Sequence, residues 1–340
     1  MGKPAVNRSS GYSVIQEAVA KFPDAPAKTL ARKLYREHPE CWTTLTACYS
    51  AVRRQFGVAG SRCRETCAAA KKTFREPRKA GWSDVIPEAL VELDGWAPIT
   101  IPGPHRALIL SDLHIPFHDV GALEVALEWG FERKPTLILL NGDIADHYAI
   151  SRWENDPRQR DFPGEVLAVK HFLSGLRKAF PEARILYRLG NHEERYERFL
   201  KFKAPELLGI PNFEWANVFA LDEYGVELID QKKPLSLGSL GTLHGHEYSF
   251  PISNPVNPAR GLFLRAKVHA ICGHFHQTSS HSEKNMRQSV VTTWSTGCLC
   301  TLNPQYRPMN NWGHGFAYAD IDKDGSFRVD NLRIIDGKAW

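Results

Sequence analysis

Five short segments of this 340-residue chain place histidine, aspartate or asparagine directly behind an apolar run. They read SDLH at 111–114, NGDIAD at 141–146, GNHE at 190–193, HGH at 244–246 and GHFH at 273–276. Carboxylates, imidazoles and amide oxygens are suitable ligands for manganese, iron, zinc and similar ions that keep open coordination positions. These groups are too many for one ion, so the sequence predicts a site for two divalent metals.

The spacing inside these segments indicates how the ligands reach one place. Two dications about 3.5 to 4 Å apart repel each other, and a shared carboxylate between them is the natural way to hold them. Asp143 is the best candidate for that bridge. In Asp112-x-His114 and His274-x-His276 an extended segment points both side chains the same way, because strand faces repeat every second residue. We therefore expect each pair to serve one metal cluster.

Alternating strand and helix patterns carry these residues. Short apolar runs at 106–112, 136–143 and 184–192 predict buried strands, and the runs at 121–132 and 162–180 predict helices. This alternation implies an α/β architecture, in which ligands bind at the carboxyl ends of the strands. The polar residues that follow successive strands are therefore expected to converge.

The order D-x-H, G-D-x-x-D, G-N-H-E, H-G-H and G-H-x-H resembles the calcineurin-like metallophosphoesterase superfamily over residues 106–334. The resemblance implies a four-layer α-β-β-α sandwich with a dinuclear metal site. It places Asp112, His114 and His276 on the first metal, Asn191, His244 and His274 on the second, and Asp143 between them. We expect manganese, with iron, zinc, nickel or magnesium as alternatives.

The same resemblance implies roles for three further residues. His192 lies outside the metal shell and donates to the leaving-group oxygen or stabilises the transition state, and Asp146 orients it. His246 is expected to lie beside the metal ligands without binding a metal itself. A hydroxide held between the metals is expected to attack phosphorus in line, without a covalent intermediate on the enzyme.

Two differences from the protein phosphatases of this superfamily indicate the type of substrate. Protein serine/threonine phosphatases of this superfamily carry arginine directly after G-D-x-x-D, where this chain has His147, and they lack the G-H-x-H pair. This pair is familiar from the phosphodiesterase and nuclease branches. The sequence therefore favours a phosphodiester substrate.

A loop past the last strand edge carries three further side chains of interest, Tyr306, Trp312 and His314. They either cap the site or pack within the loop.

The positive charge lies in the N-terminal quarter. Residues 53–79 contain nine Lys or Arg and two acids, a balance of +7, so the rest of a chain at +5 overall carries −2. Helical patterns at 29–37 and from Thr43 or Thr44 to Gly57 resemble a helix-turn-helix, with a third helix predicted at 61–75. The alternative is a packing or oligomerisation module. The candidate contacts to nucleic acid are Arg53, Arg54, Arg62, Arg64, Lys71 and Lys72.

Composition divides the chain into a helical, basic domain at 1–80, a proline-rich linker at 81–105 and a phosphoesterase domain at 106–340. No apolar run approaches the about 20 residues that a membrane helix needs, and the start lacks a secretory signal. We expect a cytoplasmic protein with no membrane partner. Seven scattered cysteines favour reduced thiols over a disulfide framework.

These observations predict a metal-dependent phosphodiesterase or nuclease that acts on nucleic acid. One alternative is a phosphomonoesterase or small-nucleotide phosphodiesterase whose N-terminal helices serve assembly. Another is a DNA-binding protein whose hydrolase domain is inactive, which the complete set of candidate ligands disfavours.

Overall fold

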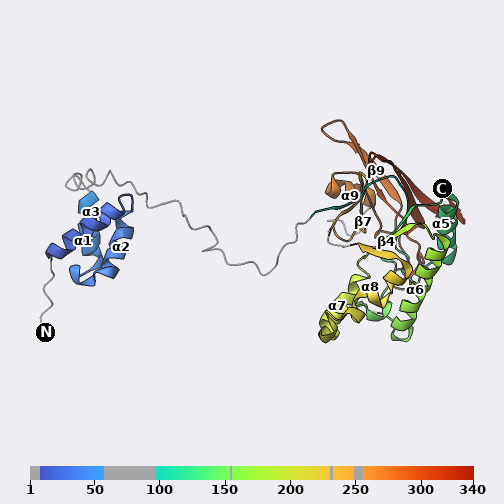
Figure 1. The fold of residues 1–340 in the computed structure, drawn as a ribbon, viewed down its shortest axis with the longest axis horizontal. Coiled ribbons are helices and arrows are strands. Elements are labelled where there is room, and N and C mark those ends of the chain that lie inside the picture. The colour runs from blue at the N-terminus through green and yellow to red at the C-terminus, as the bar shows by residue number, and fades with distance from the viewer. Residues whose placement is uncertain (1–7, 57–96, 154, 230–232, 249–255) are drawn as a thin grey trace. The chain divides into compact units, whose positions relative to one another are not determined.

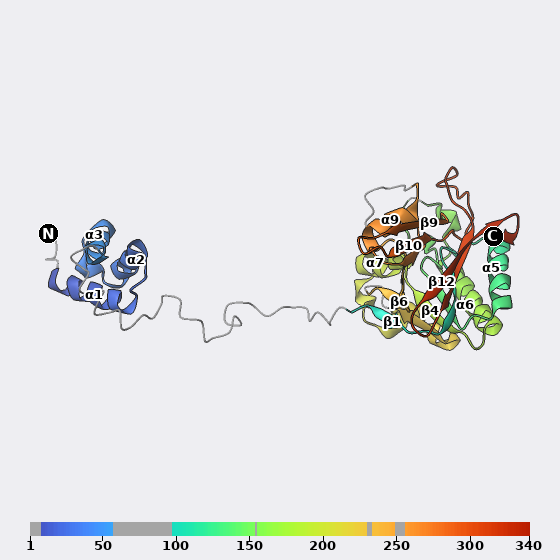
Figure 2. The same cartoon turned by 90° about the horizontal axis from the view of Figure 1, so that it is seen from above.

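The computed structural model describes residues 8–56, 97–153, 155–229, 233–248 and 256–340 (Figure 1, Figure 2). Contacts along the chain divide it into two compact units, Met1–Leu93 and Asp94–Trp340. We call these the N-terminal unit and the C-terminal unit. All the candidate metal ligands belong to the C-terminal unit.

The N-terminal unit contains three described helices, α1 (Arg8–Lys21), α2 (Ala27–Glu37) and α3 (Leu45–Phe56), around a small core. Two of the three helices predicted for this unit are confirmed as α2 and α3. The Thr44 hydroxyl accepts a hydrogen bond from the Ala47 backbone N–H at 3.1 Å, as expected of a helix cap.

The sequence of α3 spaces Leu45, Tyr49, Val52 and Phe56 at i, i+4, i+7 and i+11, which favours one buried stripe, and the structure agrees with this only in part. Val52 is fully buried, but Leu45 is exposed and Cys48 is buried in the core instead. The buried face is therefore rotated toward Cys48, because α2 packs against α3 on that side. The side chain of Phe56 lies outside the described residues.

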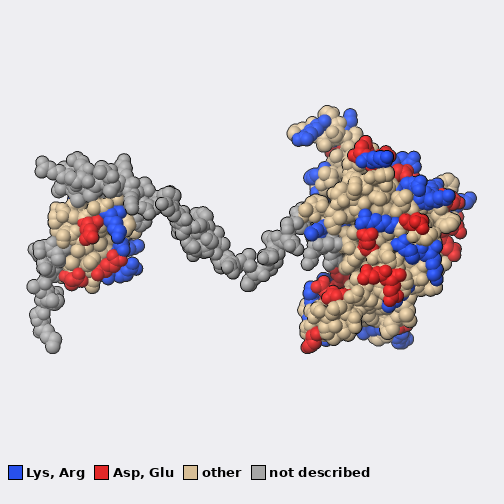
Figure 3. Space-filling model, in the orientation of Figure 1, with Lys and Arg blue, Asp and Glu red and all other residues tan. Residues whose placement is uncertain are grey.

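The structure describes two of the six residues predicted to contact nucleic acid. Arg53 and Arg54 are exposed in the last turn of α3. The predicted third helix at 61–75 lies outside the described residues, and so do Arg62, Arg64, Lys71 and Lys72. Figure 3 shows both cationic and acidic side chains on the face of the N-terminal unit that is in view.

A seven-stranded sheet lies at the centre of the C-terminal unit. Its order is β13-β12-β11-β2-β3-β4-β5, with β2 to β5 parallel and β11 antiparallel to β2. The strands are β2 (His105–Leu110), β3 (Leu137–Asn141), β4 (Arg184–Arg188), β5 (Val226–Ile229), β11 (Gly315–Ile321), β12 (Phe327–Ile335) and β13 (Lys338–Ala339). The three predicted strands are confirmed as β2, β3 and β4.

A six-stranded sheet has the order β1-β6-β7-β8-β10-β9. Its strands are β1 (Ile99–Ile101), β6 (Leu235–Leu237), β7 (Leu240–Leu243), β8 (Ala270–Cys272), β9 (Ser279–Lys284) and β10 (Val290–Ser295). Residues 99–101 were expected in the linker, but they pair in parallel with β6, so this end of the predicted linker belongs to the sheet.

Both faces of the seven-stranded sheet are buried, which explains its continuous apolar strands. In β2, Leu108 and Leu110 pack toward α5 (Val120–Arg133) and α6 (Phe162–Ala179), whereas Ala107 and Ile109 pack toward the six-stranded sheet.

The helix α9 (Pro258–Ala266) covers the far side of the six-stranded sheet, and Figure 1 shows it on the opposite side of the unit from α5 and α6. The order of layers is helix, sheet, sheet, helix, and the predicted four-layer sandwich is confirmed. Among the described helices, none is both long and apolar enough to cross a membrane.

Candidate metal centre

The candidate ligands follow the carboxyl ends of β2, β3, β4, β7 and β8, as the alternating pattern predicted. Their local backbone differs from the expectation. Asp112, His114, Asp143, His274 and His276 all have positive φ angles, between 51° and 68°, so the D-x-H and H-x-H pairs are not extended. Left-handed turns aim these side chains into the centre, at a local conformational cost that the surrounding structure must offset.

The first group of ligands lies around His276. Its Nε2 is 3.2 Å from Asp112 Oδ1 and 3.3 Å from His114 Nε2. The same His114 nitrogen lies 3.9 Å from Asp143 Oδ2. All four side chains are buried, and these are the residues assigned to the first metal together with the bridge.

The second group lies around His244. Its Nδ1 lies 2.9 Å from the Asn141 carbonyl oxygen, so Nδ1 donates there and Nε2 faces Asp143 Oδ2 at 3.2 Å. One nitrogen of His274 lies within 4.8 Å of ligand atoms from both residues. The buried Asn191 Oδ1 has no hydrogen-bond partner among the described residues, as expected of an oxygen placed for a cation.

Asp143 belongs to two candidate metal-binding groups, one with His114 and His192 and one with His244 and His274. Two glycines make room for Asp143 and His244. A Cβ on Gly190 would lie 2.2 Å from Asp143 Oδ1, and a Cβ on Gly142 would lie 2.5 Å from His244 Nδ1. The donor types and the shared carboxylate fit a pair of divalent ions.

The electrostatics of the centre follow from burying carboxylates beside imidazoles. Burial opposes ionisation, but His276 and His244 hold the pKa of Asp112 below its ordinary value, and His244 and His192 do the same for Asp143. Burial also opposes the imidazolium form, yet Asp143 raises the pKa of His244 to about 10. Since metals bind the neutral imidazole, binding releases protons and weakens as pH falls.

The other two histidines of the centre differ from each other. Burial opposes protonation of His276, but Cys298 and Asp112 raise its pKa to about 10. Burial and the neighbouring His244 lower the pKa of His274 to about 4. His274 is therefore already in the metal-binding form at neutral pH, whereas His276 must lose a proton.

His192 and Asp146 lie together at the rim of the centre. His192 Nδ1 is 2.9 Å from the Asp146 backbone oxygen and 3.2 Å from Asp146 Oδ2, and its Nε2 is 3.8 Å from Asp143 Oδ2. Asp146 Oδ2 also lies 3.0 Å from His114 Nδ1. Asp146 thus contacts a candidate ligand and the candidate proton donor at once.

Arg195, on α7 (Glu194–Lys203), was not predicted from the sequence as a site residue. Its Nη2 lies 2.8 Å from His192 Nε2, and its Nη1 donates to the Asp146 backbone oxygen at 2.9 Å. It places a positive charge beside the candidate proton donor. Arg195 lies one helical turn after His192, so its position in the sequence was compatible with a contact. Several other cations follow in the same segment, and no local pattern indicates which of them points inward.

Glu193 is a second residue that the sequence reasoning missed, although it belongs to the GNHE segment. Its buried carboxylate accepts hydrogen bonds from the backbone N–H groups of residues 143–145, at 2.8 to 3.0 Å, and from Gly190 at 2.8 Å. The Tyr187 hydroxyl donates a fifth at 2.9 Å. Glu193 therefore ties the Asp143 turn to the end of β4.

His246 and His147 lie beside the centre in different ways. The ring of His246 is 5.3 Å from that of His244, and its Nε2 lies 3.1 Å from Glu194 Oε1. His147, at the position of the phosphatase arginine, is fully buried and accepts a hydrogen bond from Trp215 Nε1 at 3.2 Å. Its side chain therefore packs in the interior.

A cysteine contacts one of the candidate ligands on the side away from the metal centre. Cys300 Sγ lies 3.9 Å from His276 Nδ1, the nitrogen opposite to the one that faces Asp112. It therefore contacts the back of a candidate ligand. The described cysteines form no disulfide with one another, and the expectation of reduced thiols stays a prediction; they are Cys41, Cys48, Cys272, Cys298 and Cys300.

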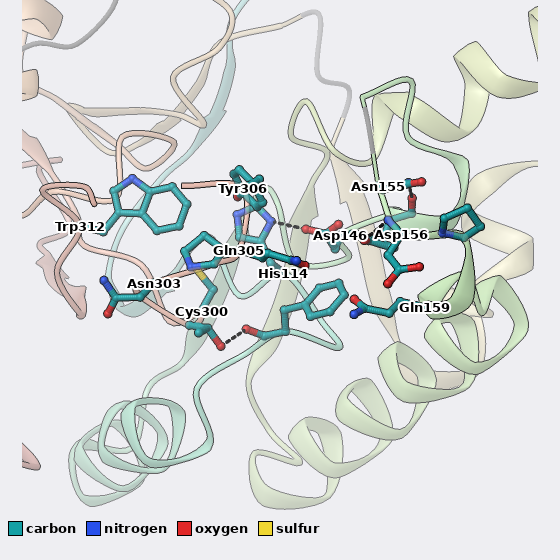
Figure 4. A pocket seen from close by; sticks show the side chains of 15 residues that line it. His114, Asp146, Asn155, Asp156, Gln159, Cys300, Asn303, Gln305, Tyr306 and Trp312 are labelled. Carbon is teal, nitrogen blue, oxygen red and sulfur yellow. Dashed lines mark hydrogen bonds and ion pairs between the residues drawn. The ribbon is translucent and has the colours of Figure 1, made fainter. Parts of the chain in front are cut away.

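A cavity of about 850 Å³ opens beside the centre, and His114 and Asp146 form part of its wall (Figure 4). Tyr306 and Trp312 line it, as one of the two alternatives for that segment predicted. His314 does not line it, and its Nε2 lies 2.9 Å from the Cys300 backbone oxygen.

Comparison with known proteins gives a family match. Residues 105–294 match the family model of calcineurin-like phosphoesterases. The gene 54 protein of Mycobacterium phage L5 is 25% identical over 252 residues, which cover 69% of this chain and 98% of the phage protein. The gene 54 protein of Mycobacterium phage D29 is 25% identical over 229 residues, covering 64% and 89% respectively.

Two solved structures illustrate the structural similarity. A dimetal phosphatase from Danio rerio has 13% sequence identity and a TM-score of 0.34, and the match covers 68% of this chain and 96% of that one. Vps29 from Cryptosporidium parvum has 13% identity and a TM-score of 0.36, with 69% and 93% covered.

Proposed function

Because this chain belongs to the calcineurin-like phosphoesterase family, we propose that it is a phosphodiesterase or nuclease that cleaves nucleic acid with two bound divalent metals. The observation that carries the proposal is the position of Asp143, which takes part in two groups of candidate ligands at once. A carboxylate in that position serves a pair of cations, and a pair of cations suits in-line displacement at phosphorus.

The residues divide into metal holders and proton handlers. Asp112, His114 and His276 would hold the first ion, Asn191, His244 and His274 the second, and Asp143 would serve both. When bound, the ions supply positive charge for the phosphoryl oxygens and lower the pKa of an attacking water. Manganese suits this mixture of carboxylate, amide and imidazole ligands.

His192 is the proposed proton donor to the leaving oxygen. Asp146 fixes its orientation through the contacts at Nδ1, so Nε2 remains at the rim of the centre, 3.8 Å from Asp143 Oδ2. Its pKa is raised, because Asp143 and Asp146 outweigh the opposing effect of burial. A general acid requires a protonated Nε2. Because Arg195 Nη2 lies 2.8 Å from Nε2 and can only donate, the Arg195 side chain must move away from Nε2 before His192 can act as the acid.

Support for a nucleic-acid substrate comes from the sequence. The basic balance of residues 53–79 would attract a polyanion, and Arg53 and Arg54 are exposed at the end of α3. His147 in place of the phosphatase arginine argues against a phosphoprotein substrate.

The test of the catalytic proposal is hydrolysis by the manganese-loaded full chain of a phosphodiester, a phosphomonoester, and single- and double-stranded DNA and RNA. We expect diesters and at least one nucleic acid to be cleaved. Asp143→Asn should abolish cleavage, whereas His192→Ala should keep both metals and mainly slow turnover. Full activity in Asp143→Asn would refute the assignment.

The proposal that the substrate is a nucleic acid is tested by measuring the binding of DNA to the full chain at several salt concentrations. The double variant Arg53→Ala/Arg54→Ala should reduce the slope of log K against log salt by about one to two, since each lost phosphate contact contributes about 0.9. Lys134→Ala/Lys178→Ala removes two exposed cations of the C-terminal unit as a matched control. Equal slopes in both variants would contradict a role for the N-terminal arginines.

A second candidate is a small-nucleotide phosphodiesterase, with the N-terminal helices serving assembly. The cavity of about 850 Å³ favours it, because this volume lies in the range of small-molecule sites. Weak, salt-independent binding of DNA together with rapid hydrolysis of dinucleotides would select this candidate.

A further inference from the structure

We propose that the cavity beside the metal centre binds an unpaired nucleobase, so that the substrate is a nucleotide ester or a single strand, not a duplex. The inference rests on the proposed function and specifies its substrate class. It applies to a polymer and to a small nucleotide alike.

The cavity begins at the candidate metal centre. His114 and Asp146 form its inner wall, and Trp312 packs on His276 with ring centroids 4.1 Å apart. In Figure 4, Tyr306 and Trp312 lie on one side of His114, and Asn155, Asp156 and Gln159 lie on the other. A phosphate at the centre would therefore have its adjoining nucleoside directed between these two walls.

Aromatic rings line both walls. On one side, Phe117 and Tyr148 are in contact with ring centroids 5.2 Å apart. On the other, Tyr306 and Trp312 have centroids 6.3 Å apart, and Tyr306 is 69% exposed. An exposed aromatic ring offers a face on which a base can stack, and stacking contributes about 1 to 3 kcal/mol per base.

Amide side chains supply the polar groups of the cavity, namely Asn155, Gln159, Asn303 and Gln305. Asn155 is held by Arg160 Nε, which donates to Oδ1 at 2.7 Å. The side chains of Gln159 and Gln305 form no hydrogen bond with another described residue. Their donors and acceptors are available for the edge of a base that is not already paired.

The charge of the cavity argues against a run of phosphates inside it. Of the described residues that line it, none is Lys or Arg, and two are acidic, Asp146 and Asp156. The Arg158 side chain pairs with Asp156 at 2.8 Å. A duplex backbone needs cations along its path, whereas a neutral, planar base needs stacking surfaces and amides. A base in a duplex cannot enter without leaving its stack.

The experiment compares two esters with the same leaving group on the manganese-loaded full chain. One is bis(4-nitrophenyl) phosphate, and the other is the 4-nitrophenyl ester of thymidine 5'-monophosphate, which adds a nucleoside. We expect kcat/KM to be at least about tenfold higher for the nucleoside ester. Tyr306→Ala should reduce this ratio about fivefold or more, and Tyr306→Phe should restore it. Phe202→Ala, at a 79% exposed aromatic on α7, is the control and should leave the ratio unchanged.

The outcomes separate the two proposals. Equal rates for both esters, or a duplex cleaved as fast as a single strand, would overturn the base pocket and leave the phosphodiesterase assignment intact. Failure to hydrolyse either ester would count against the proposed function. In that case binding of fluorescent etheno-adenosine monophosphate decides, because the pocket predicts binding that Tyr306→Ala weakens, and equal binding by both proteins would overturn it.

Discussion

The turn that presents Asp143 depends on one carboxylate, and replacing Glu193 by Gln tests this directly. Glu193 Oε2 accepts from the backbone N–H groups of Asp143 and Gly190, at 2.9 and 2.8 Å. Oε1 accepts from two further N–H groups, of residues 144 and 145, and from the Tyr187 hydroxyl. Glutamine keeps the shape but replaces one oxygen by a donor.

The new NH₂ group can replace Oε1, which accepts three hydrogen bonds, or Oε2, which accepts two. The expected loss of stability is worked for the second case, because it is the smaller. If the new NH₂ group occupies the position of Oε2, two hydrogen bonds to a charged acceptor disappear and two buried donors are left opposite a donor. Such bonds contribute about 1.5 to 3 kcal/mol each, so Glu193→Gln should weaken this region by about 3 to 6 kcal/mol. This corresponds to about two to four orders of magnitude in protection from hydrogen exchange.

The assay is hydrogen exchange of the metal-free protein, read by mass spectrometry on peptides that contain residues 143–145. Glu194→Gln is the matched control, because its side chain is 34% exposed and its Oε1 can still accept from His246. We expect that control to change protection little. Wild-type protection of residues 143–145 in Glu193→Gln would refute the inference that Glu193 holds the Asp143 turn.

Two further predictions concern Gly190 and Glu165. Gly190→Ala would place a Cβ 2.2 Å from Asp143 Oδ1, so calorimetric titration should show manganese affinity falling at least about tenfold, and unchanged affinity would contradict the steric reasoning. Burial raises the pKa of Glu165 from 4.5 to about 8. Between these values only the folded chain keeps the proton, so this stabilising contribution, fully present below pH 4.5, is lost as pH rises through 8. Glu165→Gln should remove about 5 kcal/mol of that pH dependence in urea unfolding, and an unchanged pH profile would contradict it.

The identity of the metal ligands could be predicted from the sequence because two local regularities coincide. Apolar runs of strand length mark where strands end, and the carboxyl ends of parallel strands share one edge of a sheet. Asp112, Asp143 and Asn191 each follow such a run, on three neighbouring strands. Residue type and order along the chain were therefore sufficient to name the candidates and the family.

Other features depend on contacts between residues far apart, and local patterns do not encode these. Residues 99–101 looked like part of a linker, because their strand exists only through pairing with β6, more than 130 residues later. Glu193 looked like a neighbour of His192, because nothing local shows that its carboxylate lies beneath the Asp143 turn.

The conformations of the ligand pairs and the cavity were decided in the same way. Asp112-x-His114 was expected to be extended, yet its left-handed turns are held by Gly142 and Asp143, whose backbone oxygens accept from the N–H groups of Asp112 and His114. Tyr148 and Tyr306 are far apart in the sequence, yet both line the same cavity. Sequence by itself determined which side chains carry the chemistry and which strands end beneath them. Only tertiary packing decided their distances and the surface beside them, because both depend on how separate segments meet.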